Sequence, residues 1–403
     1  MKPEQAWARL EPHLGPLPPV DLPRSAAGGR ILATPLVATV DVPGADVSAM
    51  DGYAYAGELI AGTVLSVSEV IAAGDHPGSR LAPGQSVAIM TGAPVPAQAD
   101  RVVPVERTDG GRDEVRIDAP VAAGANIRRH GEVVRDGDEI LAAGAPLTPG
   151  AVSLIATHGY ISIPVRRPPS VAVLTTGDEV VPPETVPAPG QLRDSHTDFL
   201  LAAGRTLGLS FQPLGIAPDE PEELARLVHL GLSSDVLLIG GGVSMGEFDF
   251  VEDVLSQVGC ELLFDHVSIQ PGRPLVAARH DGGLVFGLPG NPASVMACFW
   301  LFVRPALRRL QGIADGFWHG AIEGRLEGEL PGAKGRDRFL PVEVAFDRGA
   351  VRVSIARPKG SHDLVAFSRG SALVRIPAGS PPKPAGQRCE ILPLVDWVGD
   401  QRS

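Results

Sequence analysis

Three short polar loops, each directly after a buried apolar run, contain the residue types of this chain that are best suited to chemistry. They cover residues 175–179, 240–249 and 287–292, and all three contain glycine. Glycine lets a backbone approach an anionic group closely, and free N–H groups at a helix start favour phosphate. Glycine can also serve only to turn the chain. Three such loops together nevertheless indicate a site for a phosphorylated compound.

Three acids in these loops are candidate metal ligands, namely Asp178, Glu179 and Asp249. If their carboxylates converge, they would offer hard oxygen ligands to Mg²⁺, while glycine N–H groups bind the phosphates. Acids near a helix start can instead do no more than complement the helix dipole. The first interpretation predicts phosphoanhydride chemistry.

Residues 240–249 match neither of two known nucleotide-binding motifs, but they do match a hydrolase motif. A dinucleotide fingerprint beginning at Gly240 would need a third glycine where Met245 stands, and no Gly-Lys-Ser/Thr of a P-loop follows. Residues 242–246 do read Gly-x-Ser-x-Gly, which is the pattern of a hydrolase nucleophile elbow. An alternative function is therefore a serine hydrolase with Ser244 as the nucleophile. Its partners would be Asp265 and either His280 or His319.

The three loops belong to a segment, about residues 168–313, in which apolar strands alternate with helices. This alternation predicts a mostly parallel sheet with helices on both faces. The expected strands cover 171–174, 211–216, 235–239 and 284–287, and the expected helices cover 198–208, 222–231, 248–258 and 292–310. Ligands of such sheets bind at the carboxyl ends of the strands, where the polar loops are expected to lie.

The rest of the chain is expected to form an arm and two smaller β domains. Residues 1–45 and 135–167 predict an extended arm, residues 46–134 a small β domain, and residues 314–403 a C-terminal β domain. Short alternating runs between Gly- and Pro-containing turns carry this prediction. The predicted fold class is thus a multidomain α/β plus β protein around a parallel α/β sheet domain.

Composition excludes several classes. The chain has 403 residues and a net charge of -12, which disfavours nucleic acid as the main partner. Its longest apolar stretch, residues 295–303, is far shorter than the roughly 20 residues of a membrane span. Charged residues near the start do not fit a signal peptide, and three scattered cysteines fit a reducing compartment. We therefore expect a cytoplasmic protein without membrane association.

Five motifs carry a resemblance to a known family. They are Ser48-Ala-Met-Asp-Gly-Tyr-Ala54, Thr175-Thr-Gly-Asp-Glu179, Gly242-Val-Ser-Met-Gly-Glu-Phe-Asp249, Gln270-Pro-Gly-Arg-Pro274 and Gly287-Leu-Pro-Gly-Asn-Pro292. Together, and in this order, they resemble the molybdopterin molybdenumtransferase family, the MoeA and gephyrin E-domain group. The resemblance extends from the amino-terminal arm to Pro377. It implies a cytoplasmic homodimer of elongated, four-domain subunits that inserts molybdenum from molybdate into adenylated molybdopterin. The reaction releases AMP and uses Mg²⁺.

The resemblance also implies roles for individual residues. Its catalytic positions fall on Asp51, Thr91, Glu179, Asp219 and Asp249. By their position in the same loops, Asp178, Gly241, Gly242, Ser244, Pro289, Gly290 and Asn291 are expected to bind the substrate, and Arg273 is expected to face an anion. The metal would be held by Asp178, Glu179 and Asp249. The upstream molybdopterin adenylyltransferase would be a physical partner.

This chain departs from the family pattern at several positions. Val133 stands where the family often has an acid, and His196 where it commonly has Asn. His266 and Gln270 stand where lysines are common, so Gln270 loses a positive charge, whereas Arg273 keeps one. A non-catalytic scaffold like the E domain of gephyrin is a further alternative, against which the presence of Asp51, Glu179, Asp219 and Asp249 argues. The preference for molybdate or tungstate stays open.

Overall fold

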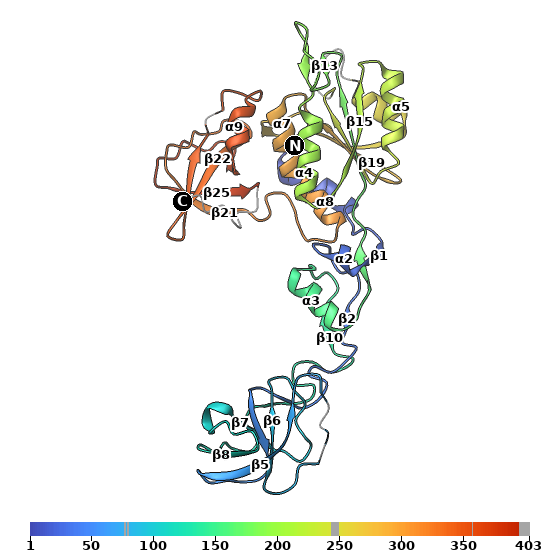
Figure 1. The fold of residues 1–403 in the computed structure, drawn as a ribbon. Coiled ribbons are helices and arrows are strands. Elements are labelled where there is room, and N and C mark those ends of the chain that lie inside the picture. Colours follow the sequence, from blue (N-terminus) through green and yellow to red (C-terminus); the bar gives the residue numbers. More distant parts are fainter. Residues whose placement is uncertain (76–77, 79, 243–249, 357, 395–403) are drawn as a thin grey trace. The chain divides into compact units, whose positions relative to one another are not determined.

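The protein divides into two compact units. The larger unit comprises Met1–Val20, Gly29–Ile31 and Arg166–Ser403, and the smaller unit comprises Asp21–Gly28 and Leu32–Val165. The computed structural model describes residues 1–75, 78, 80–242, 250–356 and 358–394. Figure 1 labels many of the elements and colours the chain from its N-terminus to its C-terminus.

A six-stranded sheet forms the centre of the larger unit. Its order is β15-β12-β16-β20-β19-β17, and its first four strands are parallel. The strands are β12 (Val171–Thr176), β15 (Phe211–Ala217), β16 (Val236–Gly240), β17 (Glu261–Phe264), β19 (Val276–His280) and β20 (Gly283–Leu288). The sequence predicted the four parallel strands, but the sheet is mixed because β19 and β17 are antiparallel at one edge. A tight turn at Asp281-Gly282 reverses the chain between β19 and β20.

Helices cover both faces of this sheet, as the sequence predicted. Successive strand residues point to opposite faces. Val171 and Val173 therefore pack in one hydrophobic cluster, and Ala172 and Leu174 in another. The first cluster includes side chains of α4 (His196–Thr206), α7 (Pro292–Cys298) and α8 (Arg304–Leu310). The second includes side chains of α5 (Pro221–Gly231) and α6 (Val251–Gln257).

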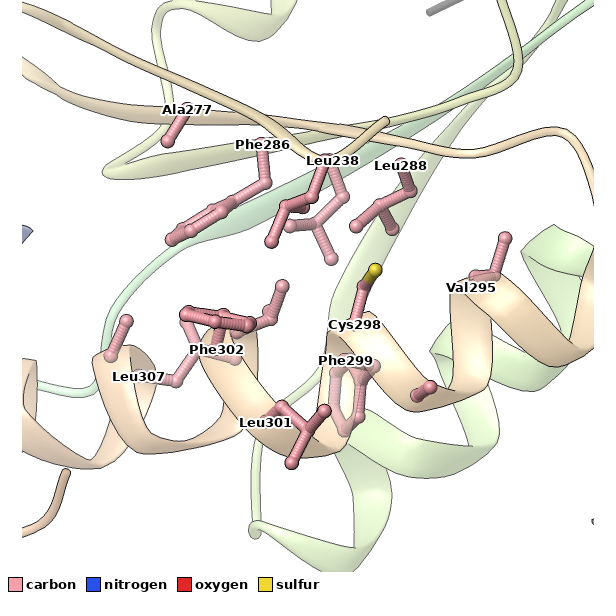
Figure 2. Close-up of a cluster of buried hydrophobic side chains, with 14 of the residues drawn as sticks. Leu238, Ala277, Phe286, Leu288, Val295, Cys298, Phe299, Leu301, Phe302 and Leu307 are labelled. Atoms are coloured by element: carbon pink, nitrogen blue, oxygen red, sulfur yellow. The ribbon is translucent and has the colours of Figure 1, made fainter. Parts of the chain in front are cut away.

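The first cluster is the principal core. Figure 2 shows Leu238, Phe286 and Leu288 of the sheet above Cys298 and Phe302 of the helical segment. Full burial of such a side chain contributes roughly 1.5–3 kcal/mol, so this contact anchors the loop that precedes α7. The helix expected over 292–310 contains a π-helical segment, Phe299–Val303, between α7 and α8.

A second sheet of the larger unit closes on itself. Its order is β18-β22-β23-β21-β25-β24, and an additional β22–β24 pairing completes the ring. The strands are β18 (Ile269–Gln270), β21 (Ile322–Leu326), β22 (Asp337–Asp347), β23 (Ala350–Ile355), β24 (Ala372–Ile376) and β25 (Arg388–Pro393). The short helix α9 (Leu364–Arg369) lies between β23 and β24 in the chain. Strand β18 comes from the α/β segment and pairs in parallel with β22. This pairing brings the residues after β18 to the start of β22.

The smaller unit contains a five-stranded sheet of order β7-β4-β6-β5-β8. Its strands are β4 (Gly52–Tyr55), β5 (Thr63–Ile71), β6 (Gln85–Ile89), β7 (Arg101–Pro104) and β8 (Glu114–Ile117). Short pairs β2 (Leu36–Val37) with β10 (Glu139–Leu141) and β3 (Val47–Ser48) with β9 (Ile127–Arg128) accompany it, as does α3 (Pro149–Thr157).

The remaining elements are short. They are α1 (Pro3–Leu10), α2 (Arg24–Ala27), β1 (Pro19–Pro23) paired with β11 (Ser162–Arg166), and β13 (Val180–Val181) paired with β14 (Leu192–Arg193). Across the described residues, no helix is long and apolar enough to cross a membrane. The division into an arm and three further domains at the boundaries given above stays a prediction.

Candidate functional site

A cavity of about 510 Å³ lies at the carboxyl ends of the parallel strands, and we call it the strand-end cavity. The polar loops that the sequence singled out form much of its wall. It is lined by Thr175, Thr176, Gly177, Glu179, Val180, Leu192, Arg193, Asp194, Ser195, His196, Asp219, Gly241, Gly242, Gly290, Pro292 and Leu364. Parallel strands end at one edge of the sheet, which explains why segments more than 100 residues apart meet here.

Two acids of neighbouring strand ends hold each other by reciprocal hydrogen bonds. Asp219 donates its backbone N–H to Oδ1 of Asp178 at 3.0 Å, and Asp178 donates its own N–H to Oδ2 of Asp219 at 3.4 Å. Asp178 follows β12 and Asp219 follows β15, and these strands are parallel neighbours. Glu179 lies beside them in the wall of the cavity. This edge of the site is therefore acidic.

The glycine loop after β16 lies against Thr176. Gly241 and Gly242 have φ angles of +105° and +64°, which L side chains rarely adopt. A Cβ on Gly241 would lie 2.7 Å from the carbonyl oxygen of Thr176, and one on Gly242 2.9 Å from its Oγ1. The Thr176 hydroxyl is buried and has no hydrogen-bond partner among the residues that the structure describes. It and the glycine backbone thus remain available for a bound group.

His196 packs between two of the loops. Its ring is close to Gly240, since a Cβ there would lie 3.0 Å from Nδ1, and it makes a hydrogen bond with the backbone of Gly290. Burial lowers the pKa of His196, although the charge of Asp194 and the bond with Gly290 act in the opposite direction. The sequence marked His196 only as a departure from the family, and the structure places it in the cavity wall.

A second cavity, of about 300 Å³, is lined by three arginines, and we call it the arginine cavity. They are Arg273, Arg336 and Arg338. None of them makes an ion pair with any carboxylate in the part of the chain that the structure describes. The other lining residues are Ile269, Gln270, Pro271, Gly272, Pro274, Asn291, Ser294, Phe339, Leu340, Pro358, Gly360, Ser361 and Phe367. A set of guanidinium groups without carboxylates suits an oxyanion.

The turn formed by residues 290–292 contributes to the walls of both cavities. Gly290 and Pro292 line the strand-end cavity, whereas Asn291 lines the arginine cavity. The backbone N–H of Ala293 donates to the carbonyl of Ser361 at 3.2 Å, so this turn is attached to the loop that precedes α9. Pro289 lines neither cavity.

Sequence reasoning missed Arg336, Arg338 and Ser361. They follow the α/β segment by more than 20 residues and reach the cavity through the pairing of β18 with β22. The only signal in the sequence is the Arg-Asp-Arg pattern of residues 336–338, because alternate residues of a strand lie on one face.

Asp51 and Thr91 lie together in the smaller unit. Thr91 donates its backbone N–H and its hydroxyl to Oδ1 of Asp51, at 2.7 and 2.8 Å. These two bonds hold the pKa of the exposed Asp51 carboxyl below its usual range. Val133, also in this unit, is 72% exposed.

The expected metal ligands are only partly placed. Glu179 lines the strand-end cavity and Asp178 lines an adjoining one, whereas Asp249 and Ser244 lie outside the described residues. Within residues 1–242 and 250–394, apart from the few positions not described, no group of three or more His, Cys, Asp or Glu could hold a metal ion. Mg²⁺ usually binds one or two carboxylates together with substrate phosphates and waters. The Asp178–Asp219 pair fits that requirement.

The histidines of the hydrolase alternative lie away from the strand-end cavity. His280 ends β19 beside Gly283, which begins β20 and therefore lies at the opposite edge of the sheet. His319 approaches Asp315 at 3.2 Å, and Asp265 approaches His266 at 2.6 Å. Ser244 itself lies outside the described residues.

Comparisons with known proteins match almost the whole chain to proteins of molybdopterin biosynthesis. Family models match residues 1–159 as the MoeA N-terminal region (domain I and II), 172–309 as a probable molybdopterin binding domain, and 323–394 as the MoeA C-terminal region (domain IV). Molybdopterin molybdenumtransferase 2 of Mycobacterium tuberculosis is 33% identical over 393 residues, which are 94% of this chain and 95% of that protein. Molybdopterin molybdenumtransferase of Staphylococcus aureus is 30% identical over 396 residues, 96% and 94% of the two chains.

Solved structures give the same result. Two crystal structures of the molybdopterin biosynthesis MoeA protein of Pyrococcus horikoshii align with TM-scores of 0.83 and 0.81, at 29% and 26% identity. Each alignment covers 98% of this chain and 100% or 99% of the other. The expected architecture, an α/β domain accompanied by β domains, is thus confirmed.

Proposed function

The chain belongs to the MoeA family of molybdopterin molybdenumtransferases, and from this premise we propose that it inserts molybdenum from molybdate into adenylated molybdopterin with release of AMP. The observation that carries the proposal is the pair of cavities that share the turn 290–292. One is acidic and glycine-lined, and the other is lined by arginines. A nucleotide and an oxyanion require two such environments.

The strand-end cavity binds the adenylated pterin. Backbone N–H groups of Gly241 and Gly242 and the Thr176 hydroxyl donate to the diphosphate. His196 is neutral near pH 7 because burial lowers its pKa, so it fixes the Gly290 turn without adding charge. Water adds across the phosphoanhydride, and the products are AMP and molybdopterin bearing one phosphate. The two dithiolene sulfurs of the pterin then bind the molybdenum of molybdate, and their two thiol protons leave with one oxo ligand as water, so molybdenum stays Mo(VI).

The acids of this cavity need a cation to accept a diphosphate. Asp178 and Asp219, with Glu179 and Asp249, would hold Mg²⁺, which would neutralise the phosphates and polarise phosphorus. The reciprocal hydrogen bonds between Asp178 and Asp219 fix the two carboxylates before substrate arrives. The roles proposed for Ser244 and Pro289 in binding this substrate rest on their sequence motifs.

The arginine cavity binds molybdate, which is a tetrahedral dianion. Arg273, Arg336 and Arg338 supply positive charge, and Asn291 and Ser361 supply further polar groups. Gln270 also lines this cavity. The positive charge of the lysine that is common in the family at this position is therefore missing from the oxyanion site. His266 is half-exposed and pairs with Asp265.

Asp51 and Thr91 are proposed catalytic residues of the smaller unit. We further propose a cytoplasmic homodimer that receives its substrate from the upstream molybdopterin adenylyltransferase. Neither the hydrolase nor the scaffold alternative finds support among the relatives, which are named as transferases.

Binding of the two ligands to separate cavities tests the proposal. In calorimetry, AMP with Mg²⁺ and molybdate should each bind in the presence of saturating amounts of the other. Gly241→Val should abolish AMP binding and leave molybdate binding intact, because its side chain would fill the loop against Thr176. Competition between the two ligands, or loss of both in this variant with the fold intact, would contradict two separate sites.

A further inference from the structure

Asp337 lies between Arg336 and Arg338 in the sequence, but its carboxylate binds other partners. It is 8% exposed, and its carboxylate accepts a hydrogen bond from the backbone N–H of Ala378 at 2.9 Å. Its second oxygen accepts from Nε and Nη2 of Arg375 at 2.8 and 2.5 Å. The negative charge of Asp337 is therefore directed away from Arg336 and Arg338.

Arg375 is fixed as firmly as its partner. Its side chain is 18% exposed, stacks over the ring of Phe317 at 5.1 Å and also pairs with Glu4 of α1. It lies on β24, opposite Phe339 of β22, so the ion pair runs diagonally between adjacent strands. Two nitrogens of a planar guanidinium on one carboxylate oxygen fix direction as well as distance.

The backbone of Asp337 joins the segments that carry the cavity arginines. Its N–H donates to the carbonyl of Ser268 at 3.1 Å, and it pairs in register with Ile269 of β18. The chain that leaves β18 then carries Gln270 and Arg273 into the cavity. Asp337 thus connects β18, β22 and the end of β24 at one position.

We propose that Asp337 and Arg375 form a clamp that positions Arg336 and Arg338 for oxyanion binding. This inference rests on the proposed role of the arginine cavity. Neither residue touches the oxyanion, so both are positioning residues. The clamp fixes the start of β22, where a free strand end would let both guanidinium groups move. The guanidinium of Arg375 offsets part of the negative charge of Asp337, so Asp337 lowers the positive potential of the cavity arginines less than an unpaired carboxylate would.

Charge and geometry predict opposite results for one substitution, which makes the clamp testable. In Asp337→Ala, a negative charge disappears near three arginines, so charge alone predicts tighter molybdate binding. Loss of the clamp predicts weaker binding, by about tenfold or more, because two binding groups lose their fixed position. The affinity of molybdate measured by calorimetry therefore distinguishes the two.

A second variant keeps the proposal testable if Asp337→Ala does not fold. Arg375→Lys keeps the charge but replaces the planar fork by a single ammonium, and the clamp again predicts weaker molybdate binding. AMP affinity at the strand-end cavity should stay unchanged in both variants, whereas general unfolding would lower it. Glu4→Gln is the matched control, since it removes the more exposed partner of Arg375 and leaves Asp337 in place. It should bind molybdate as the wild type does.

Arg338→Ala separates failure of the clamp from failure of the proposed function. Loss of a charge-assisted hydrogen bond should weaken molybdate binding by about 10- to 100-fold. If Arg338→Ala weakens binding while folded Asp337→Ala and Arg375→Lys bind as tightly as the wild type or tighter, the clamp is refuted. If Arg338→Ala itself has no effect, the oxyanion site is refuted, and the clamp with it.

Discussion

Thr91 donates two hydrogen bonds to one oxygen of Asp51, although 40 residues separate them in the chain. The carboxylate of Asp51 is exposed, so these bonds rather than burial control its ionisation. Asp51 is consequently held in one orientation and kept anionic. Both properties suit a residue that must meet a substrate with fixed charge.

Thr91→Val should raise the pKa of Asp51 toward its usual range. The largest cause of the lowered pKa, the backbone N–H of residue 91, persists, so the rise should be partial. A carboxyl with a lowered folded pKa stabilises the fold above its unfolded pKa and loses that contribution as pH falls through the folded value. Carbon-detected NMR titration, with Asp51→Asn for assignment, measures the shift. Thr91→Ser should keep the wild-type value, and an identical value in Thr91→Val would contradict the role of the hydroxyl.

Gln270→Lys should tighten molybdate binding several-fold. The new ammonium would join Arg273 and Arg338 in the arginine cavity, and attraction in a partly enclosed site exceeds that at an open surface. Calorimetry at two salt concentrations measures the gain, which should shrink at high salt. Gln387→Lys, an exposed position of the same sheet region, adds the same charge outside the cavity and should change little. An equal gain in both variants would show a general charge effect.

Asp249→Asn should leave the fold and ligand binding intact and reduce Mg²⁺-dependent AMP release by about tenfold or more, because the amide removes one anionic metal ligand. The residue lies outside the described part of the chain, so this prediction rests on the sequence motif. Asp253→Asn, an exposed acid of α6, is the matched control. Unchanged turnover of Asp249→Asn at low Mg²⁺ would refute the assigned role.

His196→Asn should reduce the sensitivity of stability to acid. Burial lowers the pKa of His196 in the folded chain, so protonation is less favourable there than in the unfolded chain, where the pKa is the ordinary value of about 6.5. Stability is therefore lost as pH falls from 7 toward 5, and the variant should lose less. Thermal unfolding midpoints across this range compare wild type, His196→Asn and the exposed control His13→Asn. Equal pH dependence of wild type and His196→Asn would show that burial of His196 does not matter.

The sequence predicted the strand-end cavity better than the arginine cavity for a physical reason. Buried apolar runs followed by polar glycine loops identify the ends of parallel strands, and all such ends meet at one edge. Glu179, Gly241 and Gly290 could therefore be placed together from the sequence. Arg336 and Arg338 could not, because their position depends on the pairing of β18 with β22, which are more than 60 residues apart in the chain.

The antiparallel strands of the central sheet could not be predicted from the sequence either. Strand β17 has only four residues, two of them exposed, so it lacks the continuous apolar run that marks the parallel strands. The β19–β20 hairpin reverses the chain through a short turn, and the sequence pattern predicted only its second strand. Residue pairs such as Asp51 with Thr91 were taken from family motifs, and the structure shows their contact.

Release of AMP from adenylated molybdopterin is the measurement that tests the central claim most directly. Purified protein, Mg²⁺ and the adenylated pterin should release AMP when molybdate is added, and the pterin should carry molybdenum afterwards. Arg338→Ala should need a higher molybdate concentration for the same rate, with little change in the pterin concentration required. Absence of both pterin binding and molybdate-dependent AMP release in the folded wild-type protein would contradict the account.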